Sequence, residues 1–135
     1  MNQNNNPSDN IPRLTQTNLN TDGWENYIDH YYPLNILVPK DWKIEPDDSY
    51  TGFYTINFSA KDHGTVKIFI SQDKFAGITN TSGLVHKTND GVEVTKYDDL
   101  LYTAKVGGYY YTFDATLAID VEKELSEMIR LAKFN

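Results

Sequence analysis

Apolar and polar side chains alternate in short runs between residues 34 and 115, and this period of two constrains the fold more than any other feature. Alternation places every second side chain on one face of a strand, so each run predicts a half-buried β-strand. The apolar members of the runs are Leu34, Ile36 and Val38; Tyr54, Ile56 and Phe58; Val66, Ile68 and Ile70; Leu100, Tyr102, Ala104 and Val106; and Tyr109, Tyr111, Phe113 and Ala115. We expect a central antiparallel sheet of about five to seven strands.

Turn residues separate these runs and join them into hairpins. The sequence Lys61-Asp62-His63-Gly64 predicts a short polar loop, and Asn89-Asp90-Gly91 predicts a turn after a short strand at 84–87. Gly107-Gly108 suits the positive φ angles of a type I′ turn. The segment 100–115 is therefore predicted to be one hairpin.

Three segments are less regular. Residues 24–31 fit a short N-terminal helix, because Trp24, Tyr27, Ile28 and Tyr31 have helical spacing, but they also fit a strand. Pro39 has no N–H to donate to a sheet, so it should end the strand before it and start a turn that leads to Trp42. Residues 72–83 are expected to be irregular, with one helical turn near Phe75.

The period changes near residue 120 to that of an amphipathic helix. Its apolar stripe consists of Val121, Leu125, Met128, Ile129 and Ala132. Asp120 is expected to cap a helix over 120–133, with acidic residues in its first turn and basic residues in its last turn. This helix should cover one face of the sheet, with Phe134 packed behind it. The fold class is therefore predicted to be α+β.

The N-terminal segment has a different composition from the rest. Residues 1–22 include seven Asn among the first twenty positions and show no apolar period. Such a segment buries too little apolar surface to offset its ordering entropy, so we expect a disordered tail before one domain at 23–135. The tail is either a frayed terminus or a polar spacer between a membrane anchor and the domain, as in mature bacterial lipoproteins.

Charge and composition exclude several classes of protein. The chain has 12 basic and 19 acidic residues, a net charge of −7, and no basic cluster of the kind that binds nucleic acid. It contains no Cys, which excludes disulfides, thiolate zinc sites and Cys nucleophiles. No apolar run approaches the roughly 20 residues that span a bilayer, so membrane attachment would need a separate anchor. We expect a monomer.

The sequence contains no recognisable catalytic, cofactor or metal motif. His30, His63 and His86 do not have the spacing of local metal ligands. The acidic groups at 45–48 and 98–99 fit turns better than calcium loops. A nucleophile elbow and a phosphate loop are both missing. We therefore expect a protein that is not an enzyme and needs no cofactor, although a pocket with His30 or His86 against two carboxylates would favour catalysis.

Aromatic residues make up 13% of the chain, more than one helix can cover. An exposed aromatic patch rimmed by Asp would mark a surface for a ligand or a protein partner. The candidate residues for this patch are Trp42, Tyr50, Phe53, Phe69 and Tyr110. The alternative is that an N-terminal helix or loop covers the second face of the sheet.

Several short motifs together resemble a known family. They are Tyr32-Pro33-Leu34-Asn35-Ile36-Leu37-Val38-Pro39-Lys40-Asp41-Trp42-Lys43-Ile44, Val66-Lys67-Ile68-Phe69-Ile70-Ser71, Gly108-Tyr109-Tyr110-Tyr111-Thr112-Phe113 and the final Leu131-Ala132-Lys133-Phe134. Over residues 24–134 the chain resembles the PsbP-like family, including its bacterial relatives and the DcrB-like lipoproteins. The resemblance implies an antiparallel sheet with helices packed on its faces. It also implies a binding or accessory role, commonly extracytoplasmic, without chemistry.

Two functional hypotheses follow. The first is a non-enzymatic extracytoplasmic binding or accessory domain, tethered to the cell envelope through its N-terminal tail. The alternative is a cytoplasmic adaptor or immunity-type protein that uses its acidic surface against a basic protein partner.

Overall fold

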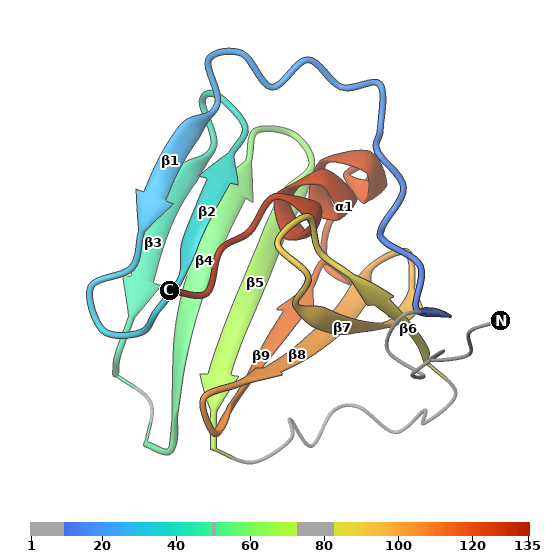
Figure 1. The fold of residues 1–135 in the computed structure, drawn as a ribbon. Coiled ribbons are helices and arrows are strands. Elements are labelled where there is room, and N and C mark those ends of the chain that lie inside the picture. Colours follow the sequence, from blue (N-terminus) through green and yellow to red (C-terminus); the bar gives the residue numbers. More distant parts are fainter. Residues whose placement is uncertain (1–9, 50, 73–82) are drawn as a thin grey trace, which may run out of the picture.

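Seven antiparallel strands form the main sheet, in the order β3-β4-β5-β9-β8-β7-β6 (Figure 1). The structure, a computed structural model, describes residues 10–49, 51–72 and 83–135. The strands of this sheet are β3 (Lys43–Asp47), β4 (Phe53–Ala60), β5 (Gly64–Ser71), β6 (Leu84–Lys87), β7 (Glu93–Asp98), β8 (Leu101–Val106) and β9 (Tyr109–Asp114). A separate two-stranded ribbon consists of β1 (Glu25–Ile28) and β2 (Asn35–Val38), and the helix is α1 (Glu122–Arg130).

The β1–β2 ribbon and α1 lie side by side on the same face of the main sheet (Figure 1). The core lies between these layers, where the sheet residues Ile56, Ile68 and Phe113 share one cluster of buried side chains with Ile36 of β2 and Leu125 of α1. Burial of such apolar surface is the main source of stability for a domain of this size. The predicted α+β class, with an antiparallel sheet of up to seven strands and a C-terminal helix on one face, is confirmed.

The hairpins that turn chemistry predicted are present. In the β4–β5 pair, Ile56 lies opposite Ile68, and β5 continues the same layer into β9. Gly107 and Gly108 both have positive φ angles, 61° and 85°, in the β8–β9 turn. Phe134 packs edge-on against Tyr111 of β9, with ring centroids 5.0 Å apart, as expected for an aromatic residue behind the helix.

The strand at residues 34–38 does not join the main sheet as a single pleated layer. It pairs with β1 instead, which makes the segment at 24–31 a strand and not a helix. Its buried side chains Leu34, Ile36 and Val38 point at the face of the main sheet. Alternation shows that one face of a strand is buried, but a strand in the sheet and a strand lying on the sheet have the same alternation. The prediction missed β3, which has only half-buried or exposed residues.

The helix begins later than predicted, and Asp120 does not cap it. Asp120 has a φ of 58°, and the residue before the helix is Val121, whose side chain is buried and makes no capping hydrogen bond. Burial of the Val121 side chain in the core fixes the entry of the chain into the helix. Asp120 then occupies the left-handed turn before it, a conformation that Asp tolerates better than most residues.

Part of the segment predicted as a tail is packed against the domain. Leu14 is buried in the core, its N–H donates to the carbonyl of Lys87, and Arg13 forms a parallel bridge with Lys87. These contacts extend the outer edge of β6 by a short length of chain, which leaves fewer backbone groups unpaired at that edge. The prediction started the domain at residue 23, whereas Pro12, Arg13 and Leu14 already contact it.

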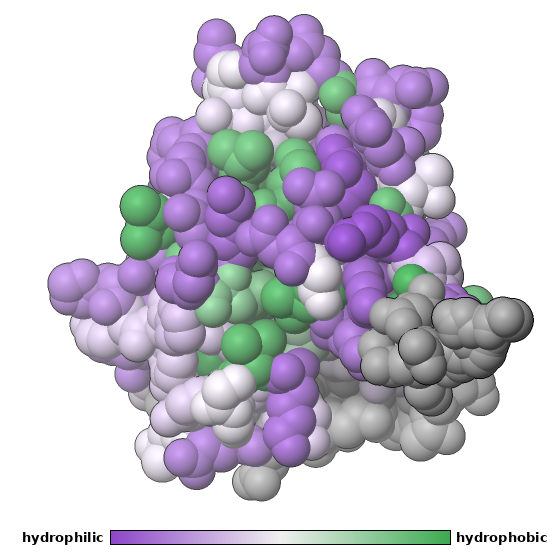
Figure 2. Space-filling view, viewed as in Figure 1, coloured by the Kyte–Doolittle hydropathy of each residue, from purple (hydrophilic) through white to green (hydrophobic). Residues whose placement is uncertain are grey.

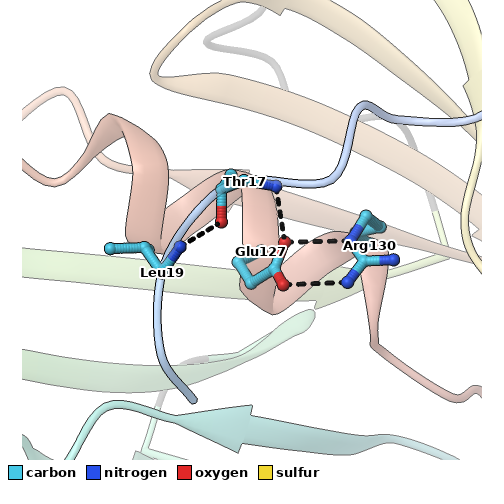
Figure 3. Close-up of polar contacts among 4 residues, drawn as sticks. All are labelled: Thr17, Leu19, Glu127 and Arg130. Atoms are coloured by element: carbon cyan, nitrogen blue, oxygen red, sulfur yellow. Dashed lines mark hydrogen bonds and ion pairs between the residues drawn. The ribbon is translucent and has the colours of Figure 1, made fainter.

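A buried ion pair fastens this N-terminal segment to the helix (Figure 3). Glu127, which is 3% exposed, accepts two hydrogen bonds from the Arg130 guanidinium at 2.8 and 2.9 Å. The N–H of Thr17 donates to the same carboxylate at 3.5 Å. The Arg130 side chain holds the pKa of the Glu127 carboxyl below its ordinary value. The carboxylate thus stays charged at neutral pH and links the helix to residues that come more than a hundred positions earlier.

Candidate binding pocket

The loop that joins β1 to β2 is organised by one buried carboxylate. Asp29 is 8% exposed, and its Oδ2 accepts hydrogen bonds from the N–H groups of Tyr31 at 2.9 Å and Tyr32 at 2.8 Å. Its own N–H donates to the carbonyl of Leu34 at 2.9 Å and closes the loop. Asp commonly bonds to the backbone two or three residues further along, which is why this residue type suits the start of the turn.

The other oxygen of the same carboxylate holds two tyrosines. Asp29 Oδ1 accepts the phenol O–H of Tyr27 at 2.6 Å and that of Tyr54 at 2.7 Å. Tyr54 is on β4, so this pair of bonds joins the β1–β2 ribbon to the main sheet. Four donors therefore share one carboxylate, and each of its oxygens accepts two of them. Such charge-assisted bonds are the stronger kind of protein hydrogen bond.

Four tyrosine rings form a continuous chain above this carboxylate. The Tyr54 ring lies 5.4 Å from those of Tyr31 and Tyr32, and the Tyr32 ring lies 5.1 Å from that of Tyr109. The planes of Tyr31 and Tyr54 meet at 75° and those of Tyr32 and Tyr109 at 71°, the edge-to-face arrangement that ring quadrupoles favour. We call Tyr31, Tyr32, Tyr54 and Tyr109 the tyrosine chain.

The phenols near Asp29 are neutral at physiological pH. Burial, assisted by the neighbouring carboxylate, raises the pKa of Tyr27 to about 12 and also raises the pKa of Tyr54. Burial likewise raises the pKa of Tyr32, and it raises that of Tyr111 to about 12. The Tyr111 O–H donates to the carbonyl of Pro33 at 3.2 Å and so fixes the end of the same loop. The site therefore presents uncharged aromatic groups.

These rings line a pocket of about 370 Å³. Its walls come from the 29–33 loop, the beginnings of β4 and β9 and the end of β5; they comprise Tyr31, Tyr32, Asp48, Gly52, Phe53, Tyr54, Ile70, Ser71, Gln72 and Tyr109. Asp48 is the one charged side chain among these described lining residues, and the Tyr31 O–H donates to it at 3.4 Å. The volume is in the usual range for a small-molecule site, roughly 300–1,000 Å³.

A second pocket of about 360 Å³ adjoins the first. It is lined by His30, Tyr31, Pro46, Asp48 and Tyr54, so that three of its five residues also line the first pocket. Tyr31, which is 59% exposed, stands between the two. The face that carries β1, β2 and α1 is mostly hydrophilic, with apolar surface visible in a hollow in its middle and lower part (Figure 2).

The structure brings three of the four described residues of the predicted aromatic patch to one face of the sheet. Phe53, Phe69 and Tyr110 do share a face, the one opposite α1, and the rings of Phe53 and Phe69 lie 5.9 Å apart. Trp42 is half-buried and packs against the core. Tyr50 lies outside the described residues, as does the helical turn expected near Phe75. Phe53 is the member of the group that also lines the pocket.

The described N-terminal residues lie on the same face of the sheet as α1, and not on the second face where an N-terminal helix or loop was expected. The described N-terminal residues, Leu14, Leu34 and Ile36 among them, bury their side chains in the same core as α1. Their apolar surface therefore forms part of the layer that contains α1.

Sequence reasoning missed the tyrosine chain because it comes from three separated segments. The run Asp29-His30-Tyr31-Tyr32-Pro33 did carry a local indication, since Asp before a short loop that ends at Pro is typical of a side-chain-stabilised turn. Nothing in the sequence linked this loop to Tyr54 or Tyr109, which contact it because the β1–β2 ribbon packs on the face of the main sheet.

The histidines occupy separate places. The His30 ring lies 5.1 Å from the Tyr31 ring, His63 Nδ1 lies 3.0 Å from the carbonyl oxygen of Ile119, and His86 is on β6. Within residues 10–49, 51–72 and 83–135, no three His, Asp or Glu side chains come close enough to hold a metal ion. In the same part of the chain, no helix has the length and apolarity needed to cross a bilayer.

Comparison of the chain with family models, with curated proteins and with solved structures gave no match. The geometry of the pocket therefore carries the functional argument.

Proposed function

We propose that this chain is a non-enzymatic binding domain and that the tyrosine-lined pocket is its ligand site. The observation that carries this proposal is the use of a buried carboxylate, Asp29, to fix the loop and two of the rings. Burying a carboxylate is costly unless it is fully hydrogen-bonded. Here the four hydrogen bonds offset that cost. They hold the Tyr54 ring and the backbone of the Tyr31 and Tyr32 loop in place, and a site that is organised in advance loses little entropy when a ligand binds.

The chemistry of the pocket favours binding over catalysis. Each oxygen of Asp29 already accepts two hydrogen bonds, so this carboxylate is poorly placed to take a proton from a substrate. The raised pKa values of Tyr27 and Tyr54 keep their phenols protonated and therefore weakly nucleophilic. What the pocket offers a ligand is aromatic surface, the polar side chains of Ser71 and Gln72 and the carboxylate of Asp48.

Binding of a small ligand can be tested by nuclear magnetic resonance on isotope-labelled protein. A panel of neutral, anionic and cationic fragments should include members that shift the amide signals of Tyr31, Gly52 and Tyr109. Tyr109→Ala should abolish these shifts. Tyr110→Ala is the matched control, because Tyr110 is the next residue of β9, is similarly half-buried and points to the opposite face of the sheet. A panel in which no fragment shifts the pocket signals would refute the proposed site.

We also propose that the domain works outside the cytoplasm, tethered to the cell envelope, as an accessory protein of PsbP-like type. The Asn-rich composition of the first twenty residues and the motifs at 32–44 and 108–113 support this placement. An antiparallel sheet covered by a C-terminal helix is the architecture that the resemblance implies. Fractionation of the producing cells, followed with antibodies against the domain, should recover the protein with the envelope. Recovery in the cytosolic fraction would contradict the proposal.

A further inference from the structure

The structure suggests which chemical class of ligand the pocket takes. We propose that the tyrosine chain and Asp48 together bind a compact alkylammonium cation, that is, a lysine-type or quaternary ammonium group. This inference rests on the proposed binding function and specifies its ligand. It rests on three observations: the arrangement of the rings, the charge of the pocket lining and the lysines that lie over two tyrosine rings elsewhere in the protein.

The ring arrangement suits a cation. In the tyrosine chain, the ring centroids of neighbouring members are 5.1–5.4 Å apart, in the order Tyr31, Tyr54, Tyr32 and Tyr109. The planes of neighbouring rings are tilted by 38° to 75°. Tilted neighbours cannot all stack on one flat ligand. Tyr54 is 4% exposed, so the accessible ring surface comes from Tyr31, Tyr32 and Tyr109. The negative face of each ring attracts a cation within about 6 Å of its centre, and sets of such faces bind quaternary ammonium groups.

The charge of the lining also favours a cation. Asp48 lines both adjoining pockets, and the described residues of the first pocket include no Lys, Arg or His. The raised pKa values of Tyr32 and Tyr54 keep these phenols neutral at neutral pH, so the charge of the described lining comes from Asp48. The chain as a whole has a net charge of −7, which raises the concentration of cations near its surface.

Two other tyrosines have a lysine of the protein beside the ring: Tyr110, which is half-buried, and Tyr102, which is 1% exposed. The Nζ of Lys105 lies 5.3 Å from the centre of the Tyr110 ring, and the Nζ of Lys96 lies 5.8 Å from that of Tyr102. Each of these rings is therefore already faced by a cation of the protein itself. In the described part of the chain, no internal lysine lies over the four rings of the pocket. A ligand would supply the missing cation there.

The test compares choline with its uncharged analogue 3,3-dimethylbutan-1-ol, which has the same shape. Titration of each compound into isotope-labelled protein should shift the signals of Tyr31 and Tyr109, with choline binding at least about fivefold more tightly. Equal affinity of the two compounds would overturn the cation proposal and leave the pocket as a site for apolar ligands. Binding of a neutral or anionic fragment, with no effect of choline or of trimethyl-lysine, would also overturn the cation proposal, but it would leave the proposed binding function intact.

Substitutions at Tyr31 distinguish the ring face from mere apolar contact. Tyr31 is largely exposed, so its variants should fold. Tyr31→Phe keeps the ring and should bind choline within about twofold of the parent protein, whereas Tyr31→Leu keeps apolar contact without the ring and should lose at least about fivefold. Asp48→Asn should weaken choline and leave the uncharged analogue unchanged. Equal binding by the Phe and Leu variants would refute the role of the ring.

The source of the ammonium group can be assigned with a second probe. Trimethyl-lysine with blocked termini carries the same cation on a peptide backbone. Tighter binding of choline would indicate a free molecule or a lipid headgroup, and tighter binding of the lysine derivative would indicate a protein side chain. Both results support an alkylammonium ligand, and failure of both probes refutes it.

Discussion

Replacing Asp29 should test whether one carboxylate holds the pocket together. Asp29→Ala removes the acceptor of four hydrogen bonds, from the phenols of Tyr27 and Tyr54 and from the N–H groups of Tyr31 and Tyr32. A buried donor that loses its acceptor costs about 1–3 kcal/mol. The two N–H groups are in a part-buried loop and can be hydrated, so we expect the free energy of unfolding to fall by about 3–5 kcal/mol in total.

Asp29→Asn should be milder, with a loss of about 1–2 kcal/mol. The amide keeps one oxygen as an acceptor for the loop N–H groups. Its NH₂ group can donate to the phenol oxygens of Tyr27 and Tyr54, whose O–H groups are free to rotate. Asn fills nearly the same space as Asp, so the loss of stability in the Asn variant reports on the hydrogen bonds alone. The further loss in the Ala variant reports on the removal of the whole side chain.

Urea unfolding at neutral pH gives both values, and near-ultraviolet circular dichroism reports the order of the tyrosine rings. Asp48→Ala is the matched control, because Asp48 is an exposed acid beside the same Tyr31 ring and should change stability by about 0.5 kcal/mol or less. A loss below about 1 kcal/mol for Asp29→Ala, or equal losses for the Ala and Asn variants, would show that the carboxylate does not organise the site.

Three further outcomes follow from single residues. Gly64→Ala should lower the free energy of unfolding by about 2 kcal/mol or more, because Gly64 has a φ of +89° and an added Cβ would collide with the carbonyl oxygen of Leu117. Gly91 has a φ of +87° but open space around it, so Gly91→Ala should lower the free energy of unfolding by only about 1 kcal/mol in the same urea assay. Thr112→Val should leave the melting temperature unchanged or raise it, since the Thr112 hydroxyl is buried without a hydrogen-bond partner, and a clear drop would refute this reasoning. Ionisation of Tyr27 should not affect the free energy of unfolding below about pH 10. Between about pH 10 and about pH 12 this free energy should fall, because Tyr27 ionises in the unfolded chain before it ionises in the folded protein. Phenolate absorbance and urea midpoints at about pH 8 and about pH 11 check the sign.

Local patterns accounted for most of the secondary structure. The hairpins at 53–71 and 101–114 follow from alternation and turn residues, and the apolar stripe of the helix predicted which of its faces is buried. Errors arose where local pattern and long-range pairing differ. Burial of Val121 replaced capping by Asp120, and an apolar strand at 35–38 paired with residues 25–28 outside the main sheet.

The aromatic content indicated a binding surface, but its location depended on register. Alternation in β9 sends Tyr109 and Tyr110 to opposite faces of the sheet, and only the pairing of β9 with β5 and β8 decides which neighbours each ring meets. Of the residues expected in one patch, Phe53, Phe69 and Tyr110 share the face opposite α1, whereas Trp42 packs against the core.

The sequence by itself determined the acidic charge, which depends on composition alone. It also determined the α+β class, the hairpins and the amphipathic helix, because these depend on patterns of residues close together in the chain. The tertiary structure alone decided the pocket. The Asp29 carboxylate meets Tyr54 across 25 positions of sequence, and Tyr32 of the β1–β2 loop meets Tyr109 of the main sheet. Contacts of this kind form only when strand order brings distant segments together, and no local period encodes that order.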